Sequence, residues 1–262
     1  MKRLMMAVLV GLVGLCLLCC FGFAISSVAT ADANITIKTR PGVTVELMVR
    51  YVKNPAALIL MLPGGLGHLD LEGRGPAAQF YKPLMAQGFN VAVIDAPSDL
   101  SNGLSPRDRQ SDEHLKDLKS VVAHLRKASS LPLWVWGISR GALSVGQAAV
   151  NDIPGISGFI FMSSPTRLPQ RAHVTGVADM ALDRIKAPVF AISHADDECR
   201  GTPPSGATRI ADAASNSRNA KAMLISGGQT FGGNPCGPGT AHTFSGVENK
   251  VAKKIATFIK SN

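Results

Sequence analysis

The sequence lacks an internal repeat at a solenoid period and a low-complexity tract. It also lacks a disordered linker, because its 26 glycines and 16 prolines are scattered along the chain. The 262 residues, 46% hydrophobic and 17% charged, suit one packed globular domain. No basic run is interleaved with aromatic residues, so no nucleic-acid partner is expected. The formal net charge of +9 is compatible with acidic substrates, but we interpret it as promoting solubility and general association with an anionic envelope.

Metal-binding and phosphate-binding motifs are also missing. After residue 31 the chain contains no H-E-x-x-H motif and no C-x-x-C pair. Ligand spacing is likewise absent among His68, His114, His124 and His173. The glycine-rich stretch 63–67 is not followed by Gly-Lys-Ser/Thr, as a phosphate-binding loop would require. We therefore expect no metal and no cofactor.

The first 31 residues have the pattern of a signal peptide. Met1-Lys2-Arg3 is positively charged, residues 4–25 are almost continuously apolar, and residues 29–31 offer the small side chains that a signal peptidase recognises. The pattern predicts cleavage after this stretch, with Ala33 as a second position, and leaves residues 32–262 as a single domain. The alternative is an uncleaved anchor in the inner membrane, because the apolar run is long enough to span a bilayer.

Removal of residues 1–31 takes away Lys2 and Arg3 and no acidic residue, so the net charge falls from +9 to +7. It also leaves two cysteines, Cys199 and Cys236. Two cysteines in an exported chain are candidates for one disulfide, because the periplasm and the extracellular space are oxidising. We expect a periplasmic or secreted protein without a stable membrane partner if the segment is cleaved. The sequence does not predict an oligomeric state.

Apolar runs of strand length alternate with helical patterns after an N-terminal hairpin around Pro41-Gly42. Strands are expected at 35–38, 43–51, 57–62, 91–94, 133–136, 156–162, 189–193 and 222–225. Helices are expected at 77–87, 111–127, 142–149 and 245–259. The pattern predicts an α/β fold with a mostly parallel central sheet, an N-terminal antiparallel hairpin and helices on both faces.

Three finer expectations follow from the same pattern. Gly88 is the expected C-cap of the helix at 77–87, and Ser245-x-x-Glu248 predicts a capping box at the start of the last helix. Only about 25 residues separate the strand at 156–162 from the strand that begins at 189. This length leaves room for little or no cap domain over the site.

The sequence Gly137-x-Ser139-x-Gly141 follows the strand at 133–136 and precedes a helical pattern. A strand, a sharp turn and a helix with serine at the apex form the context of a nucleophile elbow. Glycines suit the two flanking positions because a strained turn brings backbone segments too close for Cβ atoms. Ser139 is therefore the candidate nucleophile.

An acidic residue and a histidine follow Ser139 in chain order. Asp197 comes after the strand at 189–193, and His242 lies in a loop just before the last helix. With the elbow, this order resembles the α/β-hydrolase superfamily over essentially the whole mature chain, and more narrowly uncharacterised secreted bacterial serine hydrolases. The resemblance implies that Ser139 is the nucleophile, that His242 is general base and then acid, and that Asp197 orients the imidazole.

The resemblance also leaves one choice open. The family places its acid three residues after a position that glycine usually holds, and this rule selects Asp197. In this sequence His194 occupies that position, so Asp196 is kept as the alternative acid.

The resemblance further implies an oxyanion hole of two backbone N–H groups. One belongs to Arg140, directly after the nucleophile. The other belongs to Gly65 in the loop after the strand at 57–62, with Leu66 as the alternative. If the triad forms, the acid and histidine loops meet, and a Cys199–Cys236 disulfide would join them.

These features together predict an exported serine hydrolase that acts on a small-molecule or ester substrate. A carboxylic ester hydrolase working through an acyl-enzyme is the preferred interpretation, and a peptidase or a thioesterase would use the same residues. Two alternatives are not enzymes: an envelope binding protein that keeps the fold, and a membrane-anchored interaction protein.

Overall fold

A computed structural model of the chain describes residues 32–73, 75–168 and 174–262. The predicted signal peptide at 1–31 lies outside the described residues. Among the residues that are described, no helix combines the length and the hydrophobicity needed to cross a membrane.

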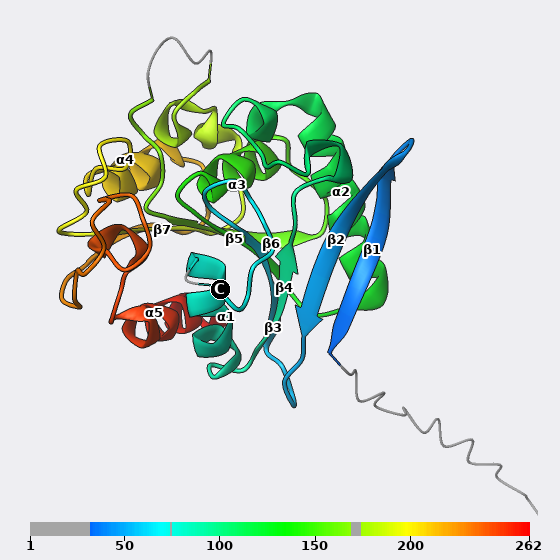
Figure 1. The fold of residues 1–262 in the computed structure, drawn as a ribbon, viewed down its shortest axis with the longest axis horizontal. Coiled ribbons are helices and arrows are strands. Elements are labelled where there is room, and N and C mark those ends of the chain that lie inside the picture. Colours follow the sequence, from blue (N-terminus) through cyan, green and yellow to red (C-terminus); the bar gives the residue numbers. More distant parts are fainter. Residues whose placement is uncertain (1–31, 74, 169–173) are drawn as a thin grey trace, which may run out of the picture. The chain divides into compact units, whose positions relative to one another are not determined.

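The described residues form an eight-stranded sheet with the strand order β1-β2-β4-β3-β5-β6-β7-β8. The strands are β1 Ala33–Arg40, β2 Val43–Arg50, β3 Ala57–Leu62, β4 Phe89–Ile94, β5 Leu133–Ile138, β6 Ile156–Met162, β7 Val189–His194 and β8 Ala220–Ile225. β1 pairs antiparallel with β2, and β2 pairs antiparallel with β4. Every other pairing is parallel, so the carboxyl ends of β3 to β8 meet at one edge. Figure 1 shows the hairpin at one end of the sheet.

The strand sequences are apolar on both faces because both faces are covered. In β3, Leu58, Leu60 and Leu62 belong to one buried cluster, and Ala57, Ile59 and Met61 belong to the other. Successive side chains of a strand point to opposite faces, so a continuous apolar run supplies two cores at once.

In the part of the chain that the structure describes, five α-helices supply the two covering layers (Figure 1). Helices α1 Pro76–Met85 and α5 Glu248–Lys260 pack on one face through side chains such as Phe80 and Phe258. The other face is covered by α2 Asp112–Ala128, α3 Gly141–Val150 and α4 Gly206–Ala213. The predicted fold class is confirmed, and α4 is an addition that the sequence patterns did not indicate.

The predicted capping box at the last helix is wrong. Helix α5 begins at Glu248 with Val247 as its N-cap, three residues after the predicted start. Phe244 and Gly246 have φ values of 57° and 81°, and left-handed backbone cannot continue a right-handed helix. The carbonyl of Ser245 instead accepts a hydrogen bond from the Gln229 N–H at 3.0 Å.

The predicted C-cap of the first helix is also wrong. Helix α1 ends at Met85 and is capped by Ala86, so Gly88 lies beyond the cap. Gly88 has φ of 88° in the turn that leads into β4, where its N–H donates to the Met85 carbonyl. Glycine is favoured there by the turn and not by the helix end.

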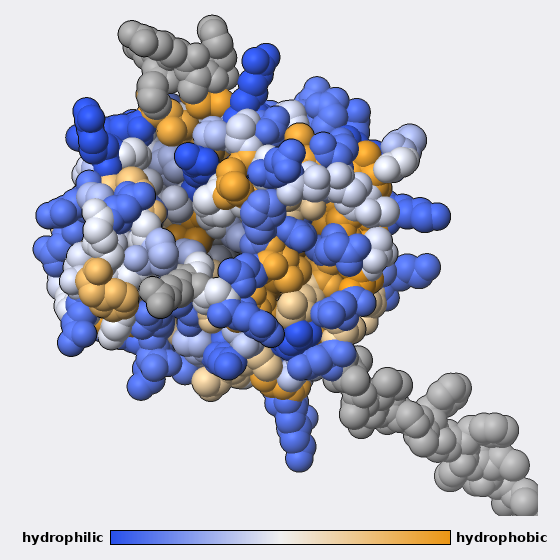
Figure 2. Space-filling model, in the orientation of Figure 1, coloured by the Kyte–Doolittle hydropathy of each residue, from blue (hydrophilic) through white to orange (hydrophobic). Residues whose placement is uncertain are grey.

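The connection between β6 and β7 carries little structure over the sheet edge. Its described residues form two short 3₁₀ helices, Val177–Asp179 and Leu182–Arg184, as expected for a chain with little or no cap domain. On the face shown in Figure 2, hydrophilic side chains cover most of the surface and hydrophobic areas are separated. Of the large apolar side chains in the described residues, three are exposed: Leu66, Leu224 and Phe231.

Candidate active site

Ser139 lies at the carboxyl end of β5 with a backbone conformation that is unusual for serine. Its φ is 52°, and its N–H donates to the Met162 carbonyl of β6 at 2.9 Å. Helix α3 begins two residues later, at Gly141. A non-glycine residue in the left-handed region is strained, and such strain gathers at functional sites where the surroundings enforce it. The strand, turn and helix of the predicted elbow are present.

The glycines beside Ser139 are required by close backbone contacts. A Cβ atom on Gly137 would lie 2.6 Å from the Gly141 carbonyl oxygen, and a Cβ on Gly141 would lie 2.0 Å from the Leu62 carbonyl oxygen. Both distances are shorter than any tolerated carbon–oxygen contact. The second one also shows that the elbow packs directly on the end of β3, where the candidate oxyanion loop begins.

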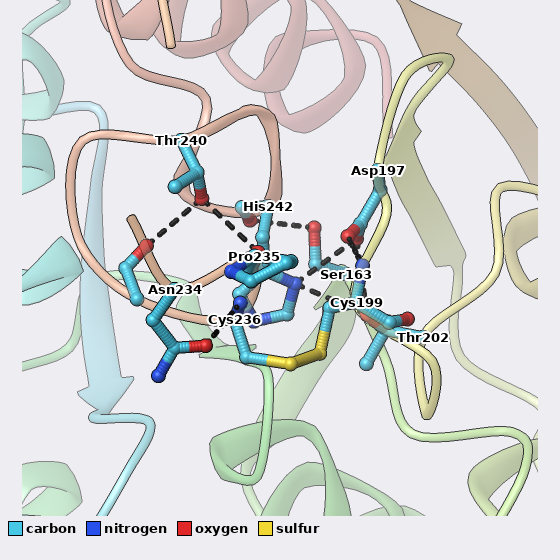
Figure 3. Close-up of a disulfide and its surroundings, with 10 residues drawn as sticks. Ser163, Asp197, Cys199, Thr202, Asn234, Pro235, Cys236, Thr240 and His242 are labelled. Carbon is cyan, nitrogen blue, oxygen red and sulfur yellow. Dashed lines mark hydrogen bonds and ion pairs between the residues drawn. A yellow bond between two sulfur atoms is a disulfide. The ribbon is translucent and has the colours of Figure 1, made fainter. Parts of the chain in front are cut away.

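Asp197 and His242 form a buried hydrogen-bonded pair (Figure 3). The Oδ2 atom of Asp197 lies 3.0 Å from Nδ1 of His242, and both side chains are almost completely buried. A carboxylate only accepts, so Nδ1 carries the proton and Nε2 presents its lone pair in neutral imidazole. Within the described residues, Nε2 is buried and has no hydrogen-bond partner. An unpaired buried nitrogen of this kind is suited to accept a proton from a bound reactant.

Ser163 fixes the histidine loop beside the elbow. Ser163 follows β6, which pairs with β5, and its Oγ donates to the His242 carbonyl at 2.9 Å (Figure 3). The loop that carries His242 is thus attached to the end of β6, the strand that pairs with β5. The Ser139 hydroxyl itself makes no hydrogen bond to any residue that the structure describes. Catalytic hydrogen bonds are often longer in the free enzyme and tighten when substrate binds.

The alternative acid, Asp196, points elsewhere. Its side chain is 76% exposed, and its carboxylate lies 3.8 Å from Nδ1 of His194. His194 is buried, with Nε2 2.8 Å from the Gly227 carbonyl and Nδ1 3.1 Å from the Asp196 N–H. The His194 imidazole therefore connects the loop after β7 with the loop after β8. His194 stands at the position where the α/β-hydrolases described above usually have glycine. The structure brings Asp197, and not Asp196, to His242.

The sequence patterns did not identify Thr202, which completes the acid's surroundings. The hydroxyl of Thr202 donates to Oδ2 of Asp197 at 3.0 Å, and its oxygen lies 3.0 Å from Nδ1 of His242 (Figure 3). The other carboxylate oxygen accepts the Cys199 N–H at 2.9 Å. No motif signals such a threonine, because its role depends on how the loop folds back after the acid.

The predicted Cys199–Cys236 disulfide is present and joins the acid loop to the histidine loop (Figure 3). Hydrogen bonds order the loop that carries Cys236: its N–H donates to Asn234 Oδ1, and Thr240 Oγ1 donates to the Gly237 carbonyl. The sulfur of Cys199 lies close to Asp197 and His242, but in a disulfide it is not a thiolate ligand for a metal.

The two N–H groups assigned to the oxyanion hole are unpaired. Neither Gly65 nor Arg140 donates its N–H to another described residue, and the same holds for the alternative donor, Leu66. The loop lies against the elbow, since a Cβ on Gly64 would be 3.2 Å from the Ser139 Cβ. Gly65 has φ of 57°, a conformation for which glycine is the favoured residue. An oxyanion hole needs backbone N–H groups that are not used in other hydrogen bonds.

No family model matches the sequence, and no curated protein matches it either. Solved structures do match over most of the chain. Est1E from Butyrivibrio proteoclasticus has a TM-score of 0.63 and 17% identity, covering 87% of this chain and 98% of its own. The esterase Pf2001 from Pyrococcus furiosus also has a TM-score of 0.63 and 17% identity, with 88% and 92% covered.

A peptidase has a similar structure. The proline iminopeptidase of Mycobacterium smegmatis has a TM-score of 0.59 and 13% identity, covering 87% of this chain and 98% of its own. Identities this low establish the fold and leave the reaction open. The strand order, the two covering layers and these likenesses agree, and the chain has the α/β-hydrolase fold.

Proposed function

We propose that this protein is an exported serine hydrolase, and more narrowly a carboxylic ester hydrolase, in which Ser139, His242 and Asp197 act as a catalytic triad. The observation that carries the proposal is the buried Asp197–His242 pair, whose unpaired Nε2 belongs to a loop fixed beside the elbow by Ser163. An imidazole held in one tautomer with its second nitrogen free is the arrangement of a general base.

In the first half of the reaction, Oγ of Ser139 attacks the ester carbonyl carbon while its proton moves to Nε2 of His242. The carbonyl oxygen gains the negative charge and accepts hydrogen bonds from the N–H groups of Gly65 and Arg140. The ester C–O bond then breaks, the alcohol leaves with the proton from Nε2, and an acyl-enzyme is formed. Asp197 stabilises the imidazolium by accepting from Nδ1 and stays ionised.

In the second half, water repeats the attack. Its proton moves to Nε2, its oxygen bonds to the acyl carbon, and the Ser139 Oγ–acyl bond breaks. The proton on Nε2 returns to Oγ, and the carboxylic acid is released. Ser139 and His242 thus return to their starting protonation states at the end of the cycle.

Two observations favour an ester over a peptide substrate. Esterases recur among the similar structures, and one of them, Est1E, has been determined with ferulic acid bound. The connection between β6 and β7 is short and holds only 3₁₀ helices in its described part, which suits an accessible small-molecule ester. Export is supported by the N-terminal sequence pattern and by the disulfide.

Labelling with a fluorophosphonate probe tests the proposal, because the probe reacts only with an activated serine. The mature protein is compared with Ser139→Ala and His242→Ala, mass spectrometry locates the adduct, and short-chain p-nitrophenyl esters are assayed in parallel. We expect labelling at Ser139 and ester hydrolysis, both lost in the two variants. Ser101→Ala is the matched control, because Ser101 is exposed and lies outside the triad.

The alternatives give different outcomes. A folded protein with an intact disulfide that neither labels nor hydrolyses would contradict the proposal and favour a non-catalytic binding protein. Labelling at Ser139 without ester hydrolysis would favour the peptidase, which a prolyl peptide substrate would detect, or the thioesterase, which an acyl thioester would detect. An intact N-terminus on the protein isolated from membranes would contradict cleavage.

A further inference from the structure

A buried arginine lies behind the candidate oxyanion loop, which we define as residues 63–67. Arg109, at the 3₁₀ helix Asp108–Gln110, is 1% exposed. No carboxylate of the described residues forms an ion pair with it, and its Nε has no hydrogen-bond partner there. Burying a guanidinium without a counter-ion is costly. Such a residue is kept where its contacts do something that an apolar side chain cannot.

The contacts of Arg109 join the two parts of the oxyanion hole. Its Nη2 donates to the Pro63 carbonyl at 3.0 Å and to the Gly65 carbonyl at 3.3 Å. Its Nη1 donates to Ser144 Oγ at 3.0 Å, on helix α3. Helix α3 begins directly after Arg140, which supplies the second candidate donor. One planar cation thus connects the oxyanion loop to the helix of the elbow.

These hydrogen bonds fix the direction of peptide groups in the loop. In a trans peptide the carbonyl and the following N–H point in opposite directions, and the described residues contain no cis peptide. The Gly65 carbonyl points to Arg109, so the Leu66 N–H points away from it. The preceding peptide is fixed separately, because the Gly64 carbonyl accepts from the Gly67 N–H at 3.0 Å. That bond sets the direction of the Gly65 N–H.

The fit around the guanidinium is close. A Cβ atom on Gly67 would lie 2.8 Å from Nη2 of Arg109, so a glycine here makes room for the cation. Burial, and next the charge of Arg140, lower the pKa of Arg109 to about 9, which leaves the guanidinium charged at neutral pH. Its hydrogen bonds to the Pro63 and Gly65 carbonyls hold the two peptides that flank the Gly64–Gly65 peptide, and so support the Gly65 N–H from both sides.

We propose that Arg109 is a positioning residue that holds the oxyanion loop against helix α3 and thereby keeps the N–H groups of the loop in place for the reacting carbonyl. The inference rests on the proposed function and deepens it. Preorganised donors stabilise the transition state more than the bound substrate, so the loss of this support lowers kcat and leaves KM nearly unchanged.

The test compares Arg109→Met and Arg109→Lys with the wild-type mature protein on a short-chain p-nitrophenyl ester. We expect kcat to fall ~10- to 100-fold in Arg109→Met, with KM changing less than about 3-fold. Affinity for an alkyl trifluoromethyl ketone, which forms a tetrahedral adduct, should fall in parallel. Arg109→Lys should retain part of the activity, because a single ammonium cannot hold both carbonyls and Ser144 together.

Arg40→Met is the control for lost stability, because Arg40 is a partly buried arginine that contacts Asp99 and Asp117 and lies outside the site. It should keep wild-type kcat and ketone affinity below its melting temperature. A folded Arg109→Met with wild-type kcat and ketone affinity would overturn the inference. If that variant does not fold, wild-type values in Arg109→Lys would overturn it.

The same experiment separates the inference from the function on which it rests. A wild-type protein that hydrolyses the ester and reacts at Ser139, with unaffected Arg109 variants, refutes only the role of Arg109. A wild-type protein without either reaction refutes the proposed hydrolase, and the role of Arg109 falls with it.

Discussion

At the scale of single residues, the site depends on hydrogen bonds made by small polar side chains. Asp197 accepts from Thr202 through one oxygen and from the Cys199 N–H through the other. Ser163 holds the carbonyl of His242. These bonds are buried, where an unmet donor or acceptor costs more than it does in water. They determine how well the acid is aligned with the base.

Thr202→Val tests this alignment, because valine keeps the shape and removes the hydroxyl. We expect kcat for ester hydrolysis to fall ~10-fold with little change in KM, since one hydrogen bond to the charged carboxylate is lost. Steady-state kinetics and the rate of fluorophosphonate labelling measure the effect. Thr257→Val is the control, because Thr257 is exposed on α5 and its hydroxyl donates to the Lys253 carbonyl of the same helix. An unchanged kcat in Thr202→Val would show that the hydroxyl does not align the acid.

At the scale of elements, two attachments hold outlying segments to the sheet. The N-terminal hairpin is attached to helix α2 by Arg40, whose Nε lies 2.8 Å from Asp117 Oδ1. Thr39 Oγ1 also donates to Asp117, which is fully buried. Hydrogen bonds to Asp117, and next to Asp99, raise the pKa of Arg40, so the Arg40 guanidinium stays charged. The second attachment is the disulfide between the acid and histidine loops.

Arg40→Met should destabilise the fold by about 3 kcal/mol, because it leaves the buried Asp117 carboxylate without its cation. Urea denaturation at pH 7 measures the free energy of unfolding. Arg209→Met is the matched control: the Arg209–Asp179 pair is 43% and 55% exposed, and exposed pairs contribute less than about 1 kcal/mol. Equal losses in both variants would contradict a special role of the buried pair.

Loss of the disulfide should affect both stability and catalysis. In the double variant Cys199→Ser, Cys236→Ser, we expect a loss of about 4 kcal/mol on the chain-entropy estimate for a sequence separation of 37. A lower kcat should accompany it, because the loops that carry Asp197 and His242 are no longer joined. Urea denaturation and ester kinetics measure the two effects. Dithiothreitol should reproduce them in the wild type and leave the variant unchanged, and a wild type indifferent to reduction would refute the prediction.

At the scale of the whole molecule, a buried histidine couples stability to pH. His114 on α2 is 4% exposed, and its Nε2 lies 2.9 Å from Ser144 Oγ. Burial, and next the charge of Arg109, lower the pKa of His114 to about 3. The unfolded chain binds a proton near pH 6.5 and the folded chain does not. Above about pH 6.5 the titration of His114 does not change the free energy of unfolding. As the pH falls from there toward 3, proton binding to the unfolded chain lowers the free energy of unfolding.

His114→Gln should weaken the dependence of the free energy of unfolding on pH at acidic pH. We expect the wild type to lose several kcal/mol more than the variant between about pH 6.5 and 3, because each unit of pKa difference corresponds to about 1.4 kcal/mol. Urea denaturation across this pH range measures it. Lys116→Gln, on the exposed side of the same helix, should keep the wild-type slope. Parallel curves for His114→Gln and the wild type would refute the assignment.

Much of the fold was predictable because it depends on local sequence patterns. The apolar runs at 57–62 and 156–162 match β3 and β6 at both ends, and the glycines around Ser139 mark a turn that only small residues permit. A strand covered on both faces must be apolar throughout, and a strained turn must have glycine beside it. Because the core strands are parallel, the loops that follow their carboxyl ends, which carry Ser139, Asp197 and His242, were expected at one edge of the sheet.

The tertiary structure decided what depends on contacts between distant segments. The sequence favoured Asp197 and left Asp196 as an alternative, and the position of His242, 45 residues after Asp197, decided between them. Arg109 contacts carbonyls 44 and 46 residues away, and backbone carbonyls leave no trace in a sequence. The capping box predicted at Ser245 was wrong for the same reason. The backbone there is held by a hydrogen bond from Gln229, which lies in a distant part of the sequence. Local sequence sets the elements, and packing selects the partners of each side chain.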